Sequence, residues 1–367
     1  MTGRLLIHVE DPGAANWVVA LVPALKTAGR GFEIVCEAGV SDYLSARGVS
    51  ADILASDVSP AELLDERQPE AILAGTSENL DSRALALIDA ARKRGLPTAA
   101  FVDQGGNAEH RFRGRTDDPL AHAPDWLFVP DRDCADAFEG LGFKGSRLVV
   151  SGNPHLDRAR QVAGELAAEG RAAVRRRVAP DAPTDRPLVV FLAEIGYVVN
   201  PEGPDWEREL QFTGRDGTAP RAARILEEVL DALNGVDPSP WIVLRLHPKN
   251  TADEFAAYAG EVDAVSAGGD PLALLWAADL VVGMSSSPLE ETHAMGRPAL
   301  SVLPHPAERK WLAGLASGAI ACVETRDDLR RILPGMLNRI DSRHEVAIPS
   351  PAAPRIVAAL DDIRAAA

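Results

Sequence analysis

The chain has 367 residues, a formal net charge of −16 and 46% hydrophobic residues, which is typical of a globular protein with room for two domains. The acidic excess argues against non-specific nucleic-acid binding, which needs a basic face. Three scattered cysteines, Cys36, Cys134 and Cys322, exclude a disulfide framework and a cysteine zinc site and fit a reducing cytosol.

Short apolar strands alternate with amphipathic helices through the first half of the chain. Strands are predicted at residues 5–9, 32–37, 70–74, 98–102, 125–129 and 147–150. Helices are predicted between them at residues 16–27, 42–47, 82–94 and 133–141. This alternation predicts a mostly parallel, doubly wound sheet.

The second half shows the same alternation of strands and helices. It follows a charged helix predicted at 156–177 and a Pro- and Asp-rich break at 180–185. Strands are predicted at residues 188–192, 241–246, 279–282 and directly after Pro298. Helices are predicted at residues 221–233, 272–277, 288–295, 327–338 and 354–366.

Two domains of similar size follow from these elements. We expect a Rossmann-like domain at 1–155, a connecting helix and linker at 156–185, and a second Rossmann-like domain at 186–345. The terminal helix, within 346–367, is expected to pack back on the first domain. A ligand cleft is predicted between the domains, at the carboxyl ends of the strands.

The N-terminus enters a strand directly, without a charged leader and an apolar region behind it, so no signal peptide is expected. No apolar run approaches the roughly 18 residues of a membrane span. We therefore expect a cytoplasmic protein without a transmembrane segment.

The segment 279–302 carries the strongest single signal. A buried strand is followed by Ser285, Ser286 and Ser287, with Pro288 at the first turn of a helix. Hydroxyls and free backbone N–H groups at a helix N-terminus form an anion site, so a phosphate is the first ligand to consider. A helix cap is the alternative role, although one serine suffices for it.

Carboxylates accompany this turn. Glu290 and Glu291 fall in the first turn of the helix, where they either match its dipole or accept hydrogen bonds from ribose hydroxyls. Glu194, after the strand at 188–192, is a further acid of the same domain.

A second strand of this domain ends in Arg245-Leu246-His247-Pro248-Lys249. Because ligands of α/β proteins bind at the carboxyl ends of strands, His247 and Lys249 are placed to meet a phosphate or a ribose oxygen. Pro248 biases His247 toward an extended backbone. An incidental strand-end turn is the alternative, but the serine turn in the same domain favours a ligand site.

The first domain offers acids at two strand ends. Asp11 and Asn16 belong to the turn between the first strand and the first helix, where small residues let a substrate approach the backbone. A plain capped turn is the alternative. Asp103 follows the strand at 98–102, next to two glycines, and is a candidate general base.

Residues after Asp103 complete this candidate site. Gln104 lies beside it, and His110 and Arg111 form a cationic group shortly after. A turn with a solvated basic loop is the alternative interpretation.

Several motifs are missing from the sequence. There is no GxGxxG after the first strand, no GxxxxGK[ST], no HExxH and no GxSxG, and the histidines lack metal-ligand spacing. These absences argue against a nicotinamide cofactor, a P-loop ATPase, a bound metal and a hydrolase triad.

The segments LRLHPK (244–249) and VVGMSSSPLEETHAMGRPALSV (281–302) resemble those of the GT-B glycosyltransferase superfamily. The resemblance is to the enzymes with a His-Pro and a Ser-Ser motif: bacterial sialyl- and polysialyltransferases, capsule Kdo transferases and CDP-glycerol glycerophosphotransferases. The C-terminal layout is also similar to the non-hydrolysing UDP-N-acetylglucosamine 2-epimerases. The first half, with VEDPGAANWV (9–18) and FVDQGGNAEHRF (101–112), resembles GT-B-like proteins of bacterial polysaccharide clusters.

The resemblance implies roles for matching residues. In that group the His-Pro pair contacts the nucleotide and the serines hold its phosphate, which maps onto His247-Pro248 and Ser285-Ser286. The acidic base maps onto Asp103, or less directly onto Asp11. The triplet Asp103-Gln104-Gly105 only approximates the acidic-acidic-Gly motif of the sialyltransferases.

The sequence thus predicts two Rossmann-like domains facing across a cleft, in a metal-independent, inverting glycosyltransferase without a cofactor. Its donor would be a CMP/CDP- or UDP-linked sugar, and its acceptor a glycan, a lipid-linked molecule or a small molecule. A UDP-sugar 2-epimerase and a non-catalytic nucleotide-binding protein are the alternatives. The expected catalytic residues are Asp103, Asp11 and His247; the donor-binding residues are His247, Pro248, Lys249, Arg245, Met284, Ser285, Ser286, Ser287, Glu290, Glu291 and Glu194; the acceptor-binding residues are Asn16, Gln104, His110 and Arg111.

Overall fold

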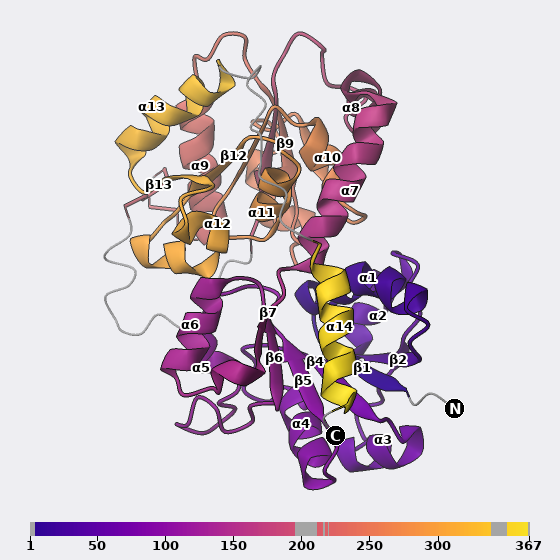
Figure 1. Cartoon of the computed structure of the whole chain (residues 1–367). Helices are drawn as coiled ribbons and strands as arrows, with labels where there is room; N and C mark the ends of the chain where they lie inside the picture. The colour runs from indigo at the N-terminus through magenta and orange to yellow at the C-terminus, as the bar shows by residue number, and fades with distance from the viewer. Residues whose placement is uncertain (1–3, 195–210, 216, 219, 339–350, 366–367) are drawn as a thin grey trace. The chain divides into compact units, whose positions relative to one another are not determined.

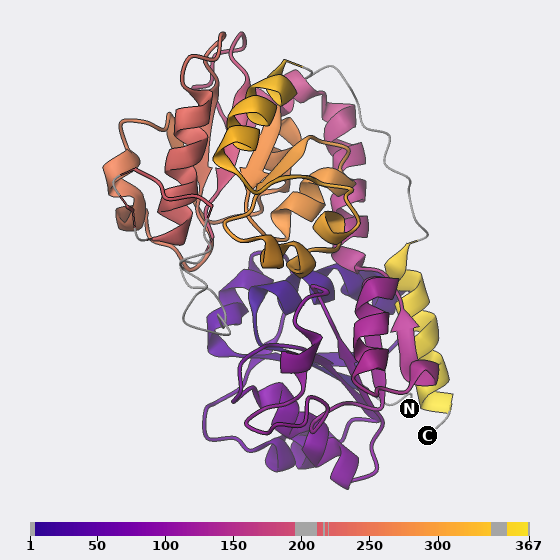
Figure 2. The same cartoon turned by 90° about the vertical axis from the view of Figure 1, so that its left-hand side faces the viewer.

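A computed structural model of the whole chain describes residues 4–194, 211–215, 217–218, 220–338 and 351–365. It divides into two compact units (Figures 1 and 2). Unit 1 comprises Met1–Arg158 and Pro349–Ala367, and unit 2 comprises Ala159–Ile348.

Unit 1 is built on a parallel sheet, with seven strands among the described residues in the order β3-β2-β1-β4-β5-β6-β7. The chain winds outward from β1 in one direction and from β4 in the other, so the topology switches between these two strands. The strands are β1 Leu5–Val9, β2 Phe32–Cys36, β3 Asp52–Ile53, β4 Ala71–Gly75, β5 Thr98–Phe101, β6 Trp126–Val129 and β7 Leu148–Val150.

Helices cover both faces of this sheet because β1 is buried on both sides. Leu5, Ile7 and Val9 pack with α1, α2 and α14, whereas Leu6 packs with α3, α4 and α6. The helices are α1 Pro12–Thr27, α2 Ala38–Ser45, α3 Pro60–Arg67, α4 Arg83–Lys93, α5 Ala108–Arg111, α6 Arg132–Gly140 and α14 Ala352–Ala365; the short 3₁₀ helix η1 spans Gly145–Arg147.

The terminal helix α14 belongs to unit 1 and packs against α1 (Figure 1). Ile356, Leu360 and Ile363 bury their side chains in the core beneath α1. Arg30 adds a salt bridge to Asp361 and donates to the carbonyl of Leu360 at 3.0 Å.

Unit 2 repeats the design with six parallel strands in the part of the chain that the structure describes, in the order β10-β9-β8-β11-β12-β13. Its topology switches between β8 and β11. The strands are β8 Leu188–Leu192, β9 Trp241–Arg245, β10 Ala264–Ser266, β11 Leu280–Gly283, β12 Ala299–Val302 and β13 Ala321–Val323. The prediction of two Rossmann-like, doubly wound domains is therefore confirmed.

Helices also cover both faces of the second sheet (Figure 2). One core lies under α9 (Arg221–Leu233), the 3₁₀ helix η3 (Ala252–Tyr258) and α13 (Arg326–Leu337). The other lies under α7, α8, α10, α11 and α12. These helices span Pro154–Glu169, Arg171–Val178, Leu272–Ala277, Pro288–Ala294 and Ala313–Ala316, and the 3₁₀ helix η4 spans Pro306–Trp311.

The boundary between the units lies inside α7, after Arg158. The charged segment that the sequence marks as one helix is two, because Gly170 adopts a φ of 88° between α7 and α8. Both helices pack in unit 2: Ala159, Leu166 and Val174 are buried in its core.

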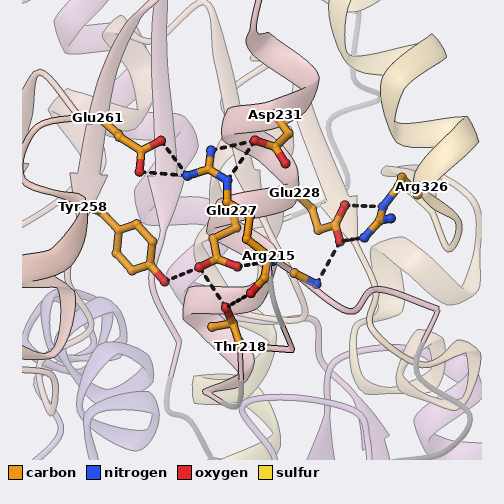
Figure 3. A network of polar contacts seen from close by, with 9 residues as sticks. Arg215, Thr218, Glu227, Glu228, Asp231, Tyr258, Glu261 and Arg326 are labelled. Carbon is orange, nitrogen blue, oxygen red and sulfur yellow. Dashed lines mark hydrogen bonds and ion pairs between the residues drawn. The ribbon is translucent and has the colours of Figure 1, made fainter.

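Carboxylates of α9 hold the chain that leads into this helix (Figure 3). Arg215 donates to Asp231 and Glu261, and Glu227 accepts from the Arg215 backbone N–H at 2.6 Å and from the Tyr258 hydroxyl at 2.7 Å. The described residues that precede α9, 211–215 and 217–218, are thus held on this helix.

None of the helices in the described parts of the chain has the length and hydropathy that crossing a bilayer requires.

Candidate functional site

In unit 2, polar side chains gather at the carboxyl ends of neighbouring strands. Glu194 follows β8, His247 follows β9, and Ser285, Ser286 and Ser287 follow β11. The strand order places these three ends side by side, at the topological switch point between β8 and β11. The position is the one at which open α/β sheets bind ligands.

The inside of the β11–α11 turn is occupied by the Glu194 carboxylate. Glu194 Oε1 accepts the backbone N–H groups of Met284, Ser285 and Ser286 at 2.9, 2.8 and 3.0 Å. The expectation of free N–H groups at this turn is therefore wrong for these three. The anion at the turn is a side chain of the protein itself.

Two further buried residues hold this carboxylate. Arg221, at the start of α9, contacts Glu194 Oε2 at 3.2 Å and forms a salt bridge with Glu308 in η4. Burial alone would lower the pKa of Arg221, but the two carboxylates raise it, so it stays charged. Burial raises the pKa of Glu308, against the effect of Arg221. Sequence reasoning missed Arg221 and Glu308.

The three serines have different environments. Ser285 is buried, and its hydroxyl lies 3.4 Å from Glu194 Oε2. The Ser286 hydroxyl oxygen is buried and finds no hydrogen-bond partner among the described residues. Ser287 occupies the N-cap position of α11, but its side chain makes no capping hydrogen bond. The simple capping role is therefore not the one that these side chains play.

His247 is held in one tautomer. Its Nδ1 accepts the backbone N–H of Lys249 at 3.1 Å, so a neutral ring carries its proton on Nε2. Burial, and then the charge of Lys249, lowers the pKa of His247, while Glu194 opposes the shift. At neutral pH the ring is therefore a neutral Nε2–H donor.

We expect His247 to titrate below the ordinary value of 6.5, and Lys249→Met to raise its pKa because a repelling cation is removed. The imidazole proton shifts in an NMR titration report both values, with Lys26→Met in unit 1 as the control. A wild-type pKa above 6.5, or no response to Lys249→Met, contradicts this account.

The other residues that were predicted to bind the sugar donor have different environments. The Met284 side chain is fully buried in the core, so only its backbone N–H faces Glu194. Arg245 turns to β10, where it donates to Ser266 Oγ at 3.0 Å. Glu290 accepts the Gly314 N–H at 3.0 Å, and Glu291 is buried. Pro248 and Lys249 are exposed.

In unit 1 the two candidate acids likewise follow strands, β1 and β5, which have β4 between them in the sheet. Asp11 follows β1, and its Oδ1 caps α1 by accepting the Ala14 N–H at 2.9 Å. Asp103 follows β5, and its Oδ1 lies 3.6 Å from Arg111 Nη1. Gly13 separates the two: a Cβ built there would lie 2.0 Å from Asp103 Oδ2 and 3.3 Å from Asp11 Oδ1. Both carboxylates thus border the same glycine.

This proximity changes the acidity of Asp11. Burial, and then repulsion from Asp103, raises the pKa of Asp11 from 3.8 to about 6, while the Ala14 N–H and Arg111 oppose the rise. Perturbed carboxyl groups of this kind are frequent at functional sites. Asp11 therefore caps α1 and at the same time lies close to Asp103, the candidate general base.

The predicted acceptor residues have partners inside unit 1. Arg111 is buried and donates to the carbonyls of Gln104 and Gly106 at 2.9 and 3.2 Å. Asn16 accepts from the Tyr43 hydroxyl at 3.0 Å, and the partly buried His110 ring lies 3.3 Å from Arg113. Of these residues, the structure brings Arg111 directly to Asp103.

Glu78 belongs to the same region of unit 1. The sequence places it after the predicted strand at 70–74, and in the structure it follows β4, accepts from Asn107 at 2.9 Å and lies 3.8 Å from Arg111. β4 flanks the switch point of the sheet. Within the described residues, no group of three or more His, Cys, Asp or Glu side chains is arranged to hold a metal ion.

Known structures share this architecture across the whole chain. A UDP-GlcNAc 2-epimerase from Neisseria meningitidis, solved with UDP-GlcNAc, is 14% identical with a TM-score of 0.67, over 98% of this chain and all of that one (100%). The UDP-GlcNAc 2-epimerase from Methanocaldococcus jannaschii is 16% identical with a TM-score of 0.66, over 98% and 99% of the chains. The spinosyn rhamnosyltransferase SpnG, solved with thymidine diphosphate, is 14% identical with a TM-score of 0.50, over 99% and 96%.

These likenesses, together with the two switch-point sheets, define a GT-B fold. No protein-family model matches the sequence. No curated protein matches it either.

Proposed function

We propose that the protein is an enzyme acting on a nucleotide-linked sugar, and that it transfers the sugar to an acceptor hydroxyl with inversion and without a metal. The observation that carries the proposal is the carboxylate pair of Asp11 and Asp103, with the pKa of Asp11 near 6. A general base works best when its pKa lies near the working pH. The GT-B neighbours solved with UDP-GlcNAc and thymidine diphosphate support a nucleotide ligand.

In this proposal unit 2 holds the nucleotide. The His247 Nε2–H and the Ser286 hydroxyl donate to phosphate oxygens, and Lys249 offsets the charge of the leaving phosphate. Unit 1 supplies the base: the carboxylate pair takes the proton of the acceptor hydroxyl, whose oxygen attacks the anomeric carbon while the bond to the phosphate breaks. Arg111 lies beside Asp103 and offsets its negative charge.

A sugar epimerase is the second candidate, for two reasons. The 2-epimerases have TM-scores of 0.67 and 0.66, against 0.50 for the rhamnosyltransferase. In addition, epimerisation removes a proton from one face of a sugar carbon and returns one to the other, which suits two neighbouring acids.

A two-step experiment separates these functions. A thermal-shift screen with CMP, CDP, UDP, GDP and ADP identifies the nucleotide, because a ligand of the native state raises its melting temperature. Incubation with the matching nucleotide sugar alone should leave the sugar unchanged, and added acceptors should yield a glycoside and free nucleotide.

The other possible outcomes of this experiment support a different function or contradict the proposal. A new sugar nucleotide formed from the donor alone supports the epimerase. Nucleotide binding without any turnover supports a binding protein. A melting temperature that no nucleotide raises contradicts the proposed function as a whole.

A further inference from the structure

The β11–α11 turn of unit 2 has an anion built into it. Three successive backbone N–H groups, those of Met284, Ser285 and Ser286, converge on Glu194 Oε1. Glu194 Oε2 faces Arg221 and the Ser285 hydroxyl at 3.2 and 3.4 Å. The carboxylate thus has five donor groups around it, in a residue that is only 8% exposed.

Buried groups close this arrangement from two sides. Behind Arg221 lies Glu308, which is completely buried and shares the guanidinium with Glu194. On the strand side, the buried Ser301 hydroxyl donates to the Met284 carbonyl. Removing Glu194 from the turn would leave three N–H groups without an acceptor, which costs the full desolvation of each. The carboxylate is therefore a fixed part of the turn.

One hydroxyl of the same turn remains available. Ser286 Oγ is buried without a hydrogen-bond partner among the described residues, although its own N–H is bound to Glu194. Buried hydroxyls in native proteins are normally satisfied, so an unsatisfied one indicates a missing acceptor. The His247 ring, whose pKa is also affected by Glu194, has its Nε2–H as a second donor, because its Nδ1 is bound to the Lys249 N–H.

We propose that Glu194 is a positioning residue: its carboxylate, held by Arg221 and Glu308, is an internal anion that sets the shape of the β11–α11 turn. A phosphate of the nucleotide then meets the Ser286 hydroxyl and the His247 ring rather than the first N–H groups of the turn. This assignment rests on the proposed function for its ligand. It differs from a simple phosphate-binding turn, in which Glu194 would compete with the ligand.

The two possibilities predict opposite changes in UDP affinity for the Glu194→Ala variant. For a positioning residue, the variant binds UDP at least about tenfold more weakly, because the turn loses its shape. Acetate or formate, which can refill the vacated position, then restores part of the UDP affinity. For a competing carboxylate, the variant binds UDP more tightly, and acetate weakens that binding.

The matched control is Asp279→Ala. Asp279 is also buried and is bound to two arginines, Arg171 and Arg175, and to the Leu188 N–H at 2.7 Å, but it lies before β11, at the opposite end of that strand from the β11–α11 turn. This variant should lose stability and keep the wild-type UDP affinity. Glu194→Gln is the milder variant: it keeps an oxygen for the three N–H groups but turns an NH₂ group toward Arg221, so UDP binding should weaken without loss of the fold.

Calorimetry gives the affinities, and thermal melting checks the fold. Tighter UDP binding by either Glu194 variant overturns the assignment, and so does equal weakening in Asp279→Ala. A wild-type protein that binds no nucleoside diphosphate instead contradicts the proposed function. In that case the melting temperature of Glu194→Ala decides alone: acetate must raise it more than that of the wild type, and a failure to do so refutes the internal anion.

Discussion

Replacing Asp11 or Asp103 by asparagine should lower the turnover of a nucleotide sugar by about 10²- to 10⁴-fold, the usual contribution of a general base. Neither change should unfold unit 1. An asparagine at position 11 can still accept the Ala14 N–H and cap α1. At position 103 the amide keeps the size of the side chain beside Gly13 and Arg111. Initial rates with saturating donor and acceptor measure the loss.

The pH dependence provides a sharper measurement. The base must be ionised, and the pKa of Asp11 is about 6, so kcat/KM should fall as the pH drops through about 6. Asp103→Asn removes a repelling charge, so the residual activity should decline at a lower pH than in the wild type. An unchanged acidic limb would show that the titrating group is another residue.

The free energy of unfolding should also depend on pH through the Asp11 carboxyl group. The folded pKa of Asp11 lies above its unfolded value of 3.8, so its contribution to stability is present below pH 3.8 and is lost as the pH rises through about 6. At pH 8 the Asp11→Asn variant should therefore have a higher free energy of unfolding than the wild type. Urea titrations at pH 8 and below pH 3.8 measure this difference in the free energy of unfolding. Asp81→Asn, which changes an exposed acid of the same unit, is the control.

The fold could be predicted from the sequence because its main strands are continuous apolar runs. β1, β4 and β8 are buried along their whole length, which only a sheet covered on both faces produces. The edge strands β3, β10 and β13 were missed for the opposite reason, whereas the edge strand β7 was predicted at 147–150. Both residues of β3 are exposed, and β10 has only three residues, among which Val265 is half exposed. Such segments carry no hydrophobic pattern.

The candidate site was likewise predicted only in part from the sequence. Strand ends are visible in a sequence, and Asp11, Asp103, His247 and the serines were found by that rule. The partners that define their chemistry come from elsewhere: Arg221 opens α9 and Glu308 lies in a short 3₁₀ helix. Arg221 lies 27 positions from Glu194 and 87 positions from Glu308 in the chain, so no local spacing could reveal these ion pairs.

Gly13→Ala should lower turnover by about 10²-fold or more while the protein stays folded. The added Cβ would lie 2.0 Å from Asp103 Oδ2, so the Asp103 carboxylate has to move. A side-chain carboxylate can move at little cost in stability, since the atom that gives way is the end of a side chain. The catalytic cost is larger, because a displacement of about 1 Å at a reacting group can reduce a rate about 10²-fold.

This substitution separates position from charge, which the asparagine variants cannot do. The glycine in the first βα turn was expected to let a substrate approach the backbone, whereas the structure fills that space with the Asp103 side chain. Gly39→Ala is the matched control, since a Cβ there meets nothing within 4 Å. Both variants should show wild-type melting temperatures within about a degree or two. Full activity in Gly13→Ala would mean that the placement of Asp103 beside Asp11 has no part in the reaction, and the base would then have to be sought among the remaining acids of unit 1, first at Glu78.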